Sequence, residues 1–342
     1  MTFAASESES EGQFMRVVMM GTGTFAEPTF EALLASRHQV VGLVTQPDRA
    51  MGEKRGSTRQ VGKGMKEIAL ERGIPVLQPE SINTPEGVAA LQNLKPDLLV
   101  VAAYGQILSR DVLGTPPKGG INVHASLLPK YRGAAPVAWA IWKGERETGV
   151  CIIRMTLGLD AGDILARGVL AIEPHETAGE LEGRLGPLGA GLAIGIVDRL
   201  ESGIVAGETQ DKSQATKAPK LTKEMGLIDW SQPAVAVANQ IRALQPWPTA
   251  YTFLHRPEQP PLRVIIAKSE AIEAVVHSSD IPVGSISLGE GTTLRVRCGD
   301  GSLKLLELQP AGKRKMNPAD FVRGNALPDA SFFGPEKLGT PS

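Results

Sequence analysis

The chain has 342 residues, enough for two domains of ordinary size. Its formal net charge of -1 excludes a strong overall attraction to nucleic acid, so such a partner would have to be held by local basic patches. Two cysteines exclude a disulfide framework, and no apolar run approaches the ~20 residues that span a membrane. We therefore expect a cytoplasmic protein without membrane contact.

Strands and helices alternate after a polar start. The first 14 residues are acidic and serine-rich and lack the apolar centre of a signal peptide, so we expect a disordered extension over 1–14. The apolar runs typical of buried strands are MRVVMMG, HQVVGLVTQ, PDLLVVAAYG and INVHAS. Stretches with helical spacing separate them, which predicts an α/β domain with a doubly wound, mostly parallel sheet over 15–206. GVCIIRM and DILARGVLAIEP lie too close together for a helical crossover and are predicted to pair antiparallel. The stretch ETAGELEGRLGPLGAGLAIGIVDRLESG predicts a long helical region broken by glycines.

The character of the chain changes after residue 206. Residues 207–224 are polar, basic and irregular, which predicts a linker. One helical stretch, AVAVANQIRAL, and several short strands separated by turns then predict a small β-barrel or sandwich over 225–330. We interpret 331–342 as a tail.

A glycine-rich turn, GTGTFA, follows the first strand and enters a helix. It fits the G-x-G-x-x-G/A pattern of dinucleotide sites. The second strand, however, ends in Thr45, Gln46 and Pro47 rather than in the acidic residue that binds a ribose. A tight turn that packs strand against helix is the alternative.

INVHAS places two polar side chains on one face of a strand. Asn122 and His124 alternate with apolar residues near the carboxyl end of this strand, where open α/β sheets bind ligands. Their N–H groups could together stabilise a developing oxyanion. A hydrogen-bonded histidine in a packed strand is the alternative.

GLDAGDIL adds two carboxylates, Asp160 and Asp163, in a glycine-flanked loop. Asp160 could orient the imidazole and take part in proton transfer, although aspartates near glycines also serve turns. No serine elbow and no plausible cysteine nucleophile accompanies His124, which favours direct transfer without a covalent intermediate. Metal-ligand spacings are also missing from the sequence, so we expect no metal.

Basic residues gather in two places. The glycine-rich stretch from Asp48 to Lys66 and the distant GKRK cluster contain the candidate RNA contacts Arg49, Lys54, Arg55, Arg59, Lys313, Arg314 and Lys315. Such clusters suit an anionic polymer such as RNA, and a solvated surface loop is the alternative.

Five segments together resemble the methionyl-tRNA formyltransferases, over about 15–324: INVHASLLPKYRGAAP, LDAGDIL, TQPDR, KLTKEMGLIDW and RALQPWPTAY. The first two are shared by the wider formyltetrahydrofolate-dependent formyltransferase family, and the last two favour its tRNA branch. The resemblance implies a Rossmann-like formyltransferase domain and an OB-like, tRNA-binding β-barrel. It also implies transfer of a formyl group from 10-formyltetrahydrofolate, a co-substrate, to the α-amino group of initiator methionyl-tRNA, by a protein that we expect to be a monomer.

The resemblance also assigns site residues. Asn122, His124 and Asp160 match the catalytic trio of the family. The segment that lines the folate site is matched by Ser126, Leu127, Leu128 and Pro129, and the stretch whose backbone faces the pterin ring by Gln106, Ile107 and Leu108. The family uses its glycine turn without a nicotinamide.

Two positions depart from the family pattern. Gly23 replaces a usual proline, and Glu53 stands where arginine is common, which leaves Lys54 and Arg55 as candidates for that contact. Three rival functions share parts of this pattern: a sugar-nucleotide formyltransferase, a 10-formyltetrahydrofolate hydrolase and a non-catalytic tRNA-binding protein. An intact trio disfavours the last of these.

Overall fold

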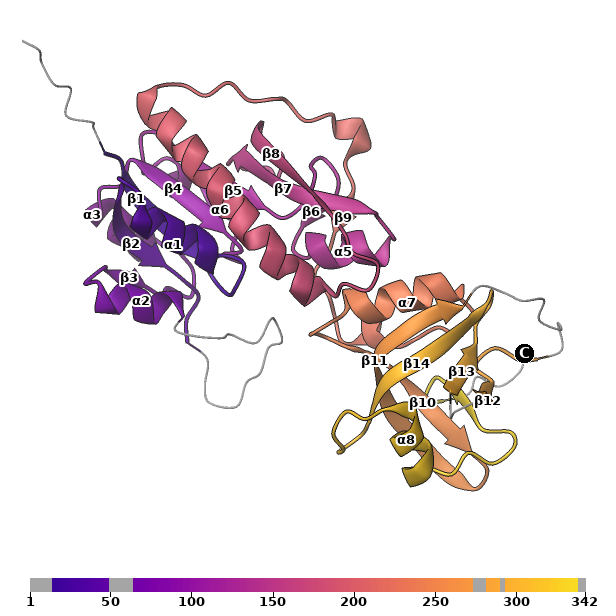
Figure 1. Ribbon diagram of the computed structural model, residues 1–342. Coiled ribbons are helices and arrows are strands. Elements are labelled where there is room, and N and C mark those ends of the chain that lie inside the picture. The colour runs from indigo at the N-terminus through magenta and orange to yellow at the C-terminus, as the bar shows by residue number, and fades with distance from the viewer. Residues whose placement is uncertain (1–13, 49–63, 273–280, 290–292, 338–342) are drawn as a thin grey trace, which may run out of the picture.

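The computed structural model describes residues 14–48, 64–272, 281–289 and 293–337 (Figure 1). The elements of the N-terminal part are β1 (Arg16–Gly21), α1 (Glu27–Ala35), β2 (Gln39–Val44), α2 (Met65–Glu71), β3 (Val76–Leu77), α3 (Pro85–Asn93), β4 (Leu98–Ala102), α4 (Arg110–Leu113), β5 (Gly120–His124), β6 (Arg132–Gly133), α5 (Pro136–Trp142), β7 (Glu147–Arg154), β8 (Ile164–Ala171) and α6 (Ala178–Ser202). After them come η1 (Lys212–Gln214), β9 (Lys217–Ala218), η2 (Glu224–Gly226), α7 (Ala234–Ala243), β10 (Ala250–Arg256), β11 (Gln259–Ile272), β12 (Ile286–Gly289), β13 (Thr293–Arg297), β14 (Ser302–Pro310), α8 (Pro318–Gly324) and β15 (Phe332–Gly334).

Seven strands form the N-terminal sheet, in the order β3-β2-β1-β4-β5-β7-β8. The first five are parallel, whereas β7 runs antiparallel to β5 and to β8. The doubly wound, mostly parallel sheet and the antiparallel pair are therefore confirmed. The strand order reverses between β1 and β4, which is where folds of this kind open a crevice for ligands.

Both faces of this sheet are covered, which explains why the strands read as continuous apolar runs. On β1, Val17 and Met19 join the core beneath α1, α5 and α6, whereas Val18 and Met20 join the core beneath α3 and α4. Figure 1 shows α1 and α6 side by side on the first of these faces.

Helix α6 runs unbroken for 25 residues, although its sequence suggested a helix interrupted by glycines. Thr177 and Glu180 form a capping box at its start, which satisfies backbone N–H groups of the first turn. Gly189 allows the helix to lie directly on the sheet, since a Cβ there would stand 2.7 Å from Cγ1 of Val123. Gly189 thus serves close packing, whereas Gly183, Gly191 and Gly195 face open space, and none of them breaks the helix.

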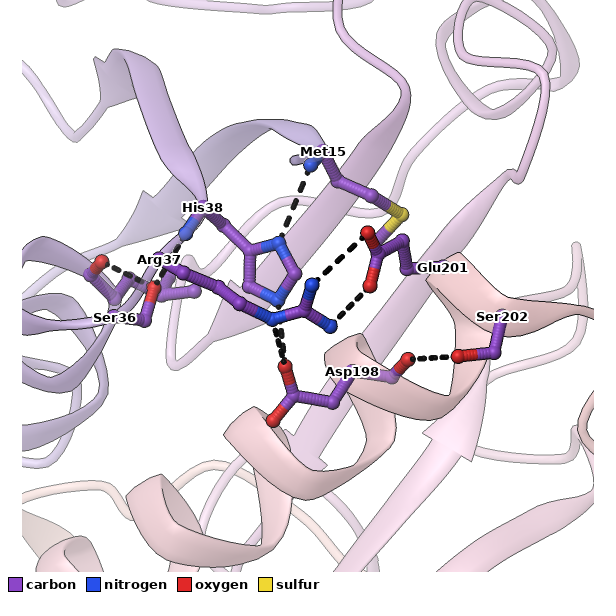
Figure 2. A network of polar contacts seen from close by, with 8 residues as sticks. Met15, Ser36, Arg37, His38, Asp198, Glu201 and Ser202 are labelled. Atoms are coloured by element: carbon purple, nitrogen blue, oxygen red, sulfur yellow. Dashed lines mark hydrogen bonds and ion pairs between the residues drawn. The ribbon is translucent and has the colours of Figure 1, made fainter. Parts of the chain in front are cut away.

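A polar network joins the end of α6 to the turn between α1 and β2 (Figure 2). Arg37 contacts both Asp198 and Glu201. The buried ring of His38 accepts the backbone N–H of Met15 at Nδ1 and bonds Asp198 through Nε2, at 3.2 and 3.0 Å. The first strand, the first helix and the last helix of the sheet domain are therefore tied together far from the carboxyl end of β5.

The C-terminal part is an antiparallel sheet in the order β12-β13-β14-β11-β10-β15, with α7 packed against it (Figure 1). Ser285, next to β12, bridges to Phe332 of β15, so the two edges of the sheet meet. This curled sheet fits the predicted OB-like barrel. Phe333 is buried in its core, so the sheet extends past residue 330, into the segment expected to be a tail.

No helix within the described ranges is long and apolar enough to cross a membrane. Of the extension predicted over 1–14, all but Phe14 lies outside the described residues.

Candidate active site

Strand β5 positions the first two predicted site residues. Ile121 and Val123 point into the core beneath α6, so the alternation of the strand turns Asn122 and His124 to the opposite face. His124 is buried, with only 5% of its surface exposed. Both side chains reach the carboxylate of Asp160, so the structure brings the predicted trio together.

Asp160 lies in the loop between β7 and β8. This loop leaves the sheet at the amino end of β5, where the N–H of Met155 donates to the carbonyl of Gly120 at 2.8 Å. It then returns to Asn122, whose Nδ2 donates to Asp160 Oδ1 at 3.3 Å, and to His124, whose Nδ1 lies 3.6 Å from Oδ2. The φ of Asp160 is +48°, a left-handed conformation that aspartate tolerates better than most residues.

The backbone of Gly133 makes the shortest bond to the same carboxylate. Its N–H donates to Asp160 Oδ2 at 2.8 Å. Gly133 has φ +128°, and a Cβ there would stand 2.5 Å from the carbonyl oxygen of Ala218. Only glycine therefore lets this N–H face Asp160 while β6 pairs with β9. The glycine of YRGAAP thus has a role that the motif alone did not reveal.

The ring of His124 lies between two oxygen acceptors. Nε2 donates to the carbonyl of Tyr131 at 3.0 Å and must carry a proton, because a carbonyl oxygen only accepts. Nδ1 faces the carboxylate of Asp160 at 3.6 Å, a separation longer than a hydrogen bond, so the structure leaves this nitrogen without a hydrogen-bond partner among the described residues. The Tyr131 hydroxyl donates to Glu145 at 2.8 Å, and burial together with this bond raises the pKa of the phenol, which stays a donor and anchors the segment.

Cys151 lies directly across from His124 on β7. It is buried among Leu128, Ile153 and Ile164, and burial raises the pKa of its thiol. A buried thiol of raised pKa is a poor nucleophile, which agrees with the expectation of a reaction without a covalent cysteine intermediate.

The predicted folate segment forms the turn after β5. The Ser126 hydroxyl donates to the carbonyl of Lys130 at 2.7 Å, and the bond from Leu128 to Pro129 is cis. Leu128 is buried beside Cys151, whereas Leu127 and Pro129 are half-buried. Ser126 and Leu128 thus shape this turn, and the surface that remains is formed by Leu127 and Pro129.

The predicted pterin segment follows β4. Leu108 is buried, while Ile107 is 69% exposed. The side chain of Gln106 binds the backbone of the loop between β3 and α3. It accepts from the N–H of Ile82 and donates to the carbonyl of Glu80. The segment is therefore held by its own side chains and presents one large apolar group to solvent.

The GTGTFA turn is tied to the end of β2. The N–H of Ala26 donates to the carbonyl of Gly23, and the hydroxyls of Thr22 and Thr45 lie 3.2 Å apart. Gly23, which stands where the family usually has proline, has φ +81°. The turn thus links the carboxyl ends of β1 and β2.

The predicted RNA contacts divide into two sets. Arg49, Lys54, Arg55 and Arg59 lie outside the described residues. Lys313, Arg314 and Lys315 are exposed on the loop between β14 and α8. Lys315 forms an ion pair with Glu307 at 3.3 Å.

Comparison with known proteins covers both parts of the chain. Residues 15–193 match the formyl transferase family, and residues 220–326 match the formyl transferase C-terminal domain. A methionyl-tRNA formyltransferase from Caldanaerobacter subterraneus subsp. tengcongensis is 43% identical over 93% of this chain and 100% of its own length. Another, from Desulfotalea psychrophila, is 42% identical over 94% of this chain and 96% of its own length. The chain belongs to the methionyl-tRNA formyltransferase family.

Solved structures of more distant proteins share its fold. The N-formyltransferase from Helicobacter canadensis, in complex with folinic acid and dTDP-3-aminofucose, superposes with a TM-score of 0.63 at 17% identity. It covers 89% of this chain and is itself covered completely. HypX from Aquifex aeolicus in complex with tetrahydrofolic acid covers 91% of this chain with a TM-score of 0.57, at 16% identity and over 47% of its own length. These structures show the fold, whereas the family models and the curated relatives confirm the resemblance to methionyl-tRNA formyltransferases in the sequence and show that the chain is an enzyme of formyl transfer.

Sequence reasoning missed several groups that surround the trio in this family member. The Tyr131 carbonyl and the Gly133 N–H act through the backbone, which leaves no side-chain signal. The side chain of Gln210, in the predicted linker, bonds the backbone carbonyl of Asp160 at 2.9 Å. Its chain distance of 50 residues from Asp160 placed it outside every motif.

Proposed function

We propose that this chain transfers the formyl group of 10-formyltetrahydrofolate to the α-amino group of initiator methionyl-tRNA. The full-length similarity to curated methionyl-tRNA formyltransferases, which extends through both domains, is the observation that carries this proposal. The arrangement of the trio also supports it, because the Asn122 amide and the His124 ring, both able to donate hydrogen bonds, lie next to the carboxylate of Asp160.

The formyl donor supplies an electrophilic carbonyl carbon. A C–N bond forms from the methionyl amine to this carbon, the bond to folate N10 breaks, and the amine proton must leave as N10 gains one. Asn122 has a second amide proton beyond the one given to Asp160, and this proton can bind the formyl oxygen. Protonated His124 can supply the second donor from Nδ1, because Nε2 is already bonded to the Tyr131 carbonyl and the contact of Nδ1 with Asp160 is longer than a hydrogen bond. These donors stabilise the charge that builds on the formyl oxygen.

Asp160 is the group in this trio that can take the amine proton. Its carboxylate already accepts from Asn122 and Gly133, which orients it, and it faces the imidazole of His124. A proton taken from the amine can then pass, directly or through water, to the leaving nitrogen.

The segments assigned to the formyl donor suit a flat aromatic molecule. Ile107 and two leucines of the Asp160 loop, Leu157 and Leu159, are more than half exposed. Exposed apolar side chains next to polar site residues are typical of ligand surfaces. We propose that these side chains, with the turn 126–129, bind the folate.

The proposal is tested by one assay of formyl transfer from 10-formyltetrahydrofolate. We expect transfer to methionyl-tRNA and none to free methionine, to uncharged tRNA or to an amino-sugar nucleotide. Release of formate without any acceptor would instead favour a hydrolase. Transfer to the amino-sugar nucleotide in place of methionyl-tRNA would contradict the proposed acceptor.

The exposed basic loop after β14 gives a prediction about the tRNA. Replacing Lys313 and Arg314 together by alanine should raise KM for methionyl-tRNA and lower the slope of log KM against log salt by about 1 for each lost phosphate contact. KM for the formyl donor should not change. Lys315→Ala is the matched control with a smaller expected effect, because this lysine already pairs with Glu307. An unaltered salt slope in the double variant would remove the loop from the tRNA interface.

A further inference from the structure

The side chain of Gln210 is buried and fully used in hydrogen bonds. Only 5% of the residue is exposed. Its Nε2 donates to the carbonyl oxygens of Asp160 and Gly162, at 2.9 and 2.7 Å. Its Oε1 accepts from Nε and a terminal nitrogen of Arg132, at 3.1 and 2.7 Å. One amide thus connects the loop that carries Asp160 with the segment that carries Gly133.

The residues around Gln210 continue this contact along the same loop. Glu208 exchanges two backbone bonds with Ile164, both of 2.8 Å, and the hydroxyl of Thr209 donates to the carboxylate of Asp163 at 3.1 Å. The stretch 208–210 therefore runs beside the end of the Asp160 loop. A segment whose composition predicted a linker thus contacts the loop that carries Asp160.

The same segment then supports the other side of the trio. The carbonyl of Thr216 accepts from the N–H of Arg132, and its hydroxyl accepts from the N–H of Tyr131. Arg132 and Gly133 next pair with Lys217 and Ala218. The Tyr131 carbonyl that holds His124 and the Gly133 N–H that holds Asp160 are thus both set from residues 210–218.

Two features show why the Asp160 loop needs hydrogen bonds from outside the loop to hold its conformation. Asp160 has a left-handed φ of +48°, which is less stable for a non-glycine residue unless its surroundings hold it. Its loop also has glycine at positions 158 and 162, so the backbone alone specifies this conformation weakly. Two hydrogen bonds from one buried amide, to the carbonyls on either side of Ala161, supply the missing restraint.

We propose that Gln210 is a positioning residue for the reaction: it fixes the carboxylate of Asp160 relative to His124 by clamping the Asp160 loop to Arg132. This inference rests on the proposed function, since it concerns the geometry of the proposed trio. A displacement of about 1 Å in a reacting group can lower turnover by 10²-fold, so loss of the clamp acts on turnover rather than on substrate binding.

Gln210→Glu removes the hydrogen bonds to the Asp160 loop but keeps the contact with Arg132. Glutamate keeps an oxygen for Arg132 but replaces the amide donor by an oxygen that repels the carbonyls of Asp160 and Gly162. We expect kcat to fall about 10- to 100-fold, with KM for both substrates changed less than about 3-fold, and a pH–rate profile altered in the direction of that of Asp160→Asn. If the glutamate variant does not fold, Gln210→Met is the replacement test: methionine keeps the length of the side chain without a charge and without the amide donor, and the same changes in kcat are expected.

Gln240 of α7 offers a matched control. It is a second buried glutamine, 8% exposed, whose Nε2 also donates to two backbone carbonyls, those of Met225 and Leu227 at 2.9 and 3.1 Å. Gln240→Glu should lower the melting temperature comparably while kcat and the pH–rate profile stay those of the wild type.

A measurement without turnover keeps this inference separate from the proposed function. The chain has five histidines, so the ring resonances of His124 can be assigned by comparison with His124→Ala. Their chemical shifts and pH dependence should change in Gln210→Glu and not in Gln240→Glu. Failure of the wild type to formylate methionyl-tRNA would reject the function alone. A folded Gln210→Glu protein with wild-type kcat, pH profile and His124 resonances would overturn the clamp.

Discussion

Replacing His124 by alanine should lower the turnover number about 10²–10³-fold, the usual loss when one donor to a developing oxyanion is removed. The ring lies between the Tyr131 carbonyl and the Asp160 carboxylate, and the proposed mechanism assigns its Nδ1 to the formyl oxygen. Binding of the formyl donor should persist, because the substitution leaves unchanged the segments proposed to bind the folate, 106–108 and 126–129. Steady-state kinetics and equilibrium titration with the folate measure the two effects.

His38→Ala is the matched control for this variant. His38 is also buried, lies in the same domain and bonds through both ring nitrogens, but to Met15 and Asp198 (Figure 2). Loss of these bonds should reduce the free energy of unfolding by about 1–3 kcal/mol without a comparable fall in kcat. Turnover of His124→Ala within a few-fold of that of His38→Ala would remove the imidazole from the mechanism.

Asp160→Asn should reduce turnover about 10²–10⁴-fold, the range for a group that transfers protons in the reaction. Asparagine tolerates the left-handed φ of this position and keeps the size of the side chain. An amide, however, has one oxygen, so it cannot accept from both Asn122 and Gly133 as the carboxylate does. It also lacks the negative charge that the carboxylate presents to the ring of His124, so we expect the pH–rate profile to change along with kcat.

Asp163→Asn, three residues further on, provides the comparison. Its carboxylate accepts the Thr209 hydroxyl at 3.1 Å, a bond that an amide oxygen can also accept. We expect kcat to stay close to the wild-type value. If Asp160→Asn retained full activity with an unaltered pH profile, Asp160 would be a turn residue, the alternative that its glycine-rich surroundings allow.

The sequence predicted many strands of the sheet because the pattern that marks a strand lies within the strand itself. Continuous apolar runs marked β1 and β4, and alternation in INVHAS marked β5 with both polar side chains on one face. The short interval between β7 and β8 predicted their antiparallel pairing. The same reasoning was wrong for the glycines of α6, because a Gly189 that lies against Val123 cannot be distinguished in sequence from one that breaks a helix.

By itself, the sequence determined the two-part architecture and the family and nominated the candidate trio, because periodicity, composition and motif residues are properties of neighbouring positions. Only the tertiary structure decided what holds the trio in place. The Tyr131 carbonyl and Gly133 N–H are backbone groups that every residue type carries, and Gln210 meets Asp160 across 50 positions of chain. Such bonds depend on how β6, β9 and the Asp160 loop come together in space. A polar side chain such as that of Gln210 can therefore be buried in a segment that is otherwise mostly exposed, once its amide finds partners there.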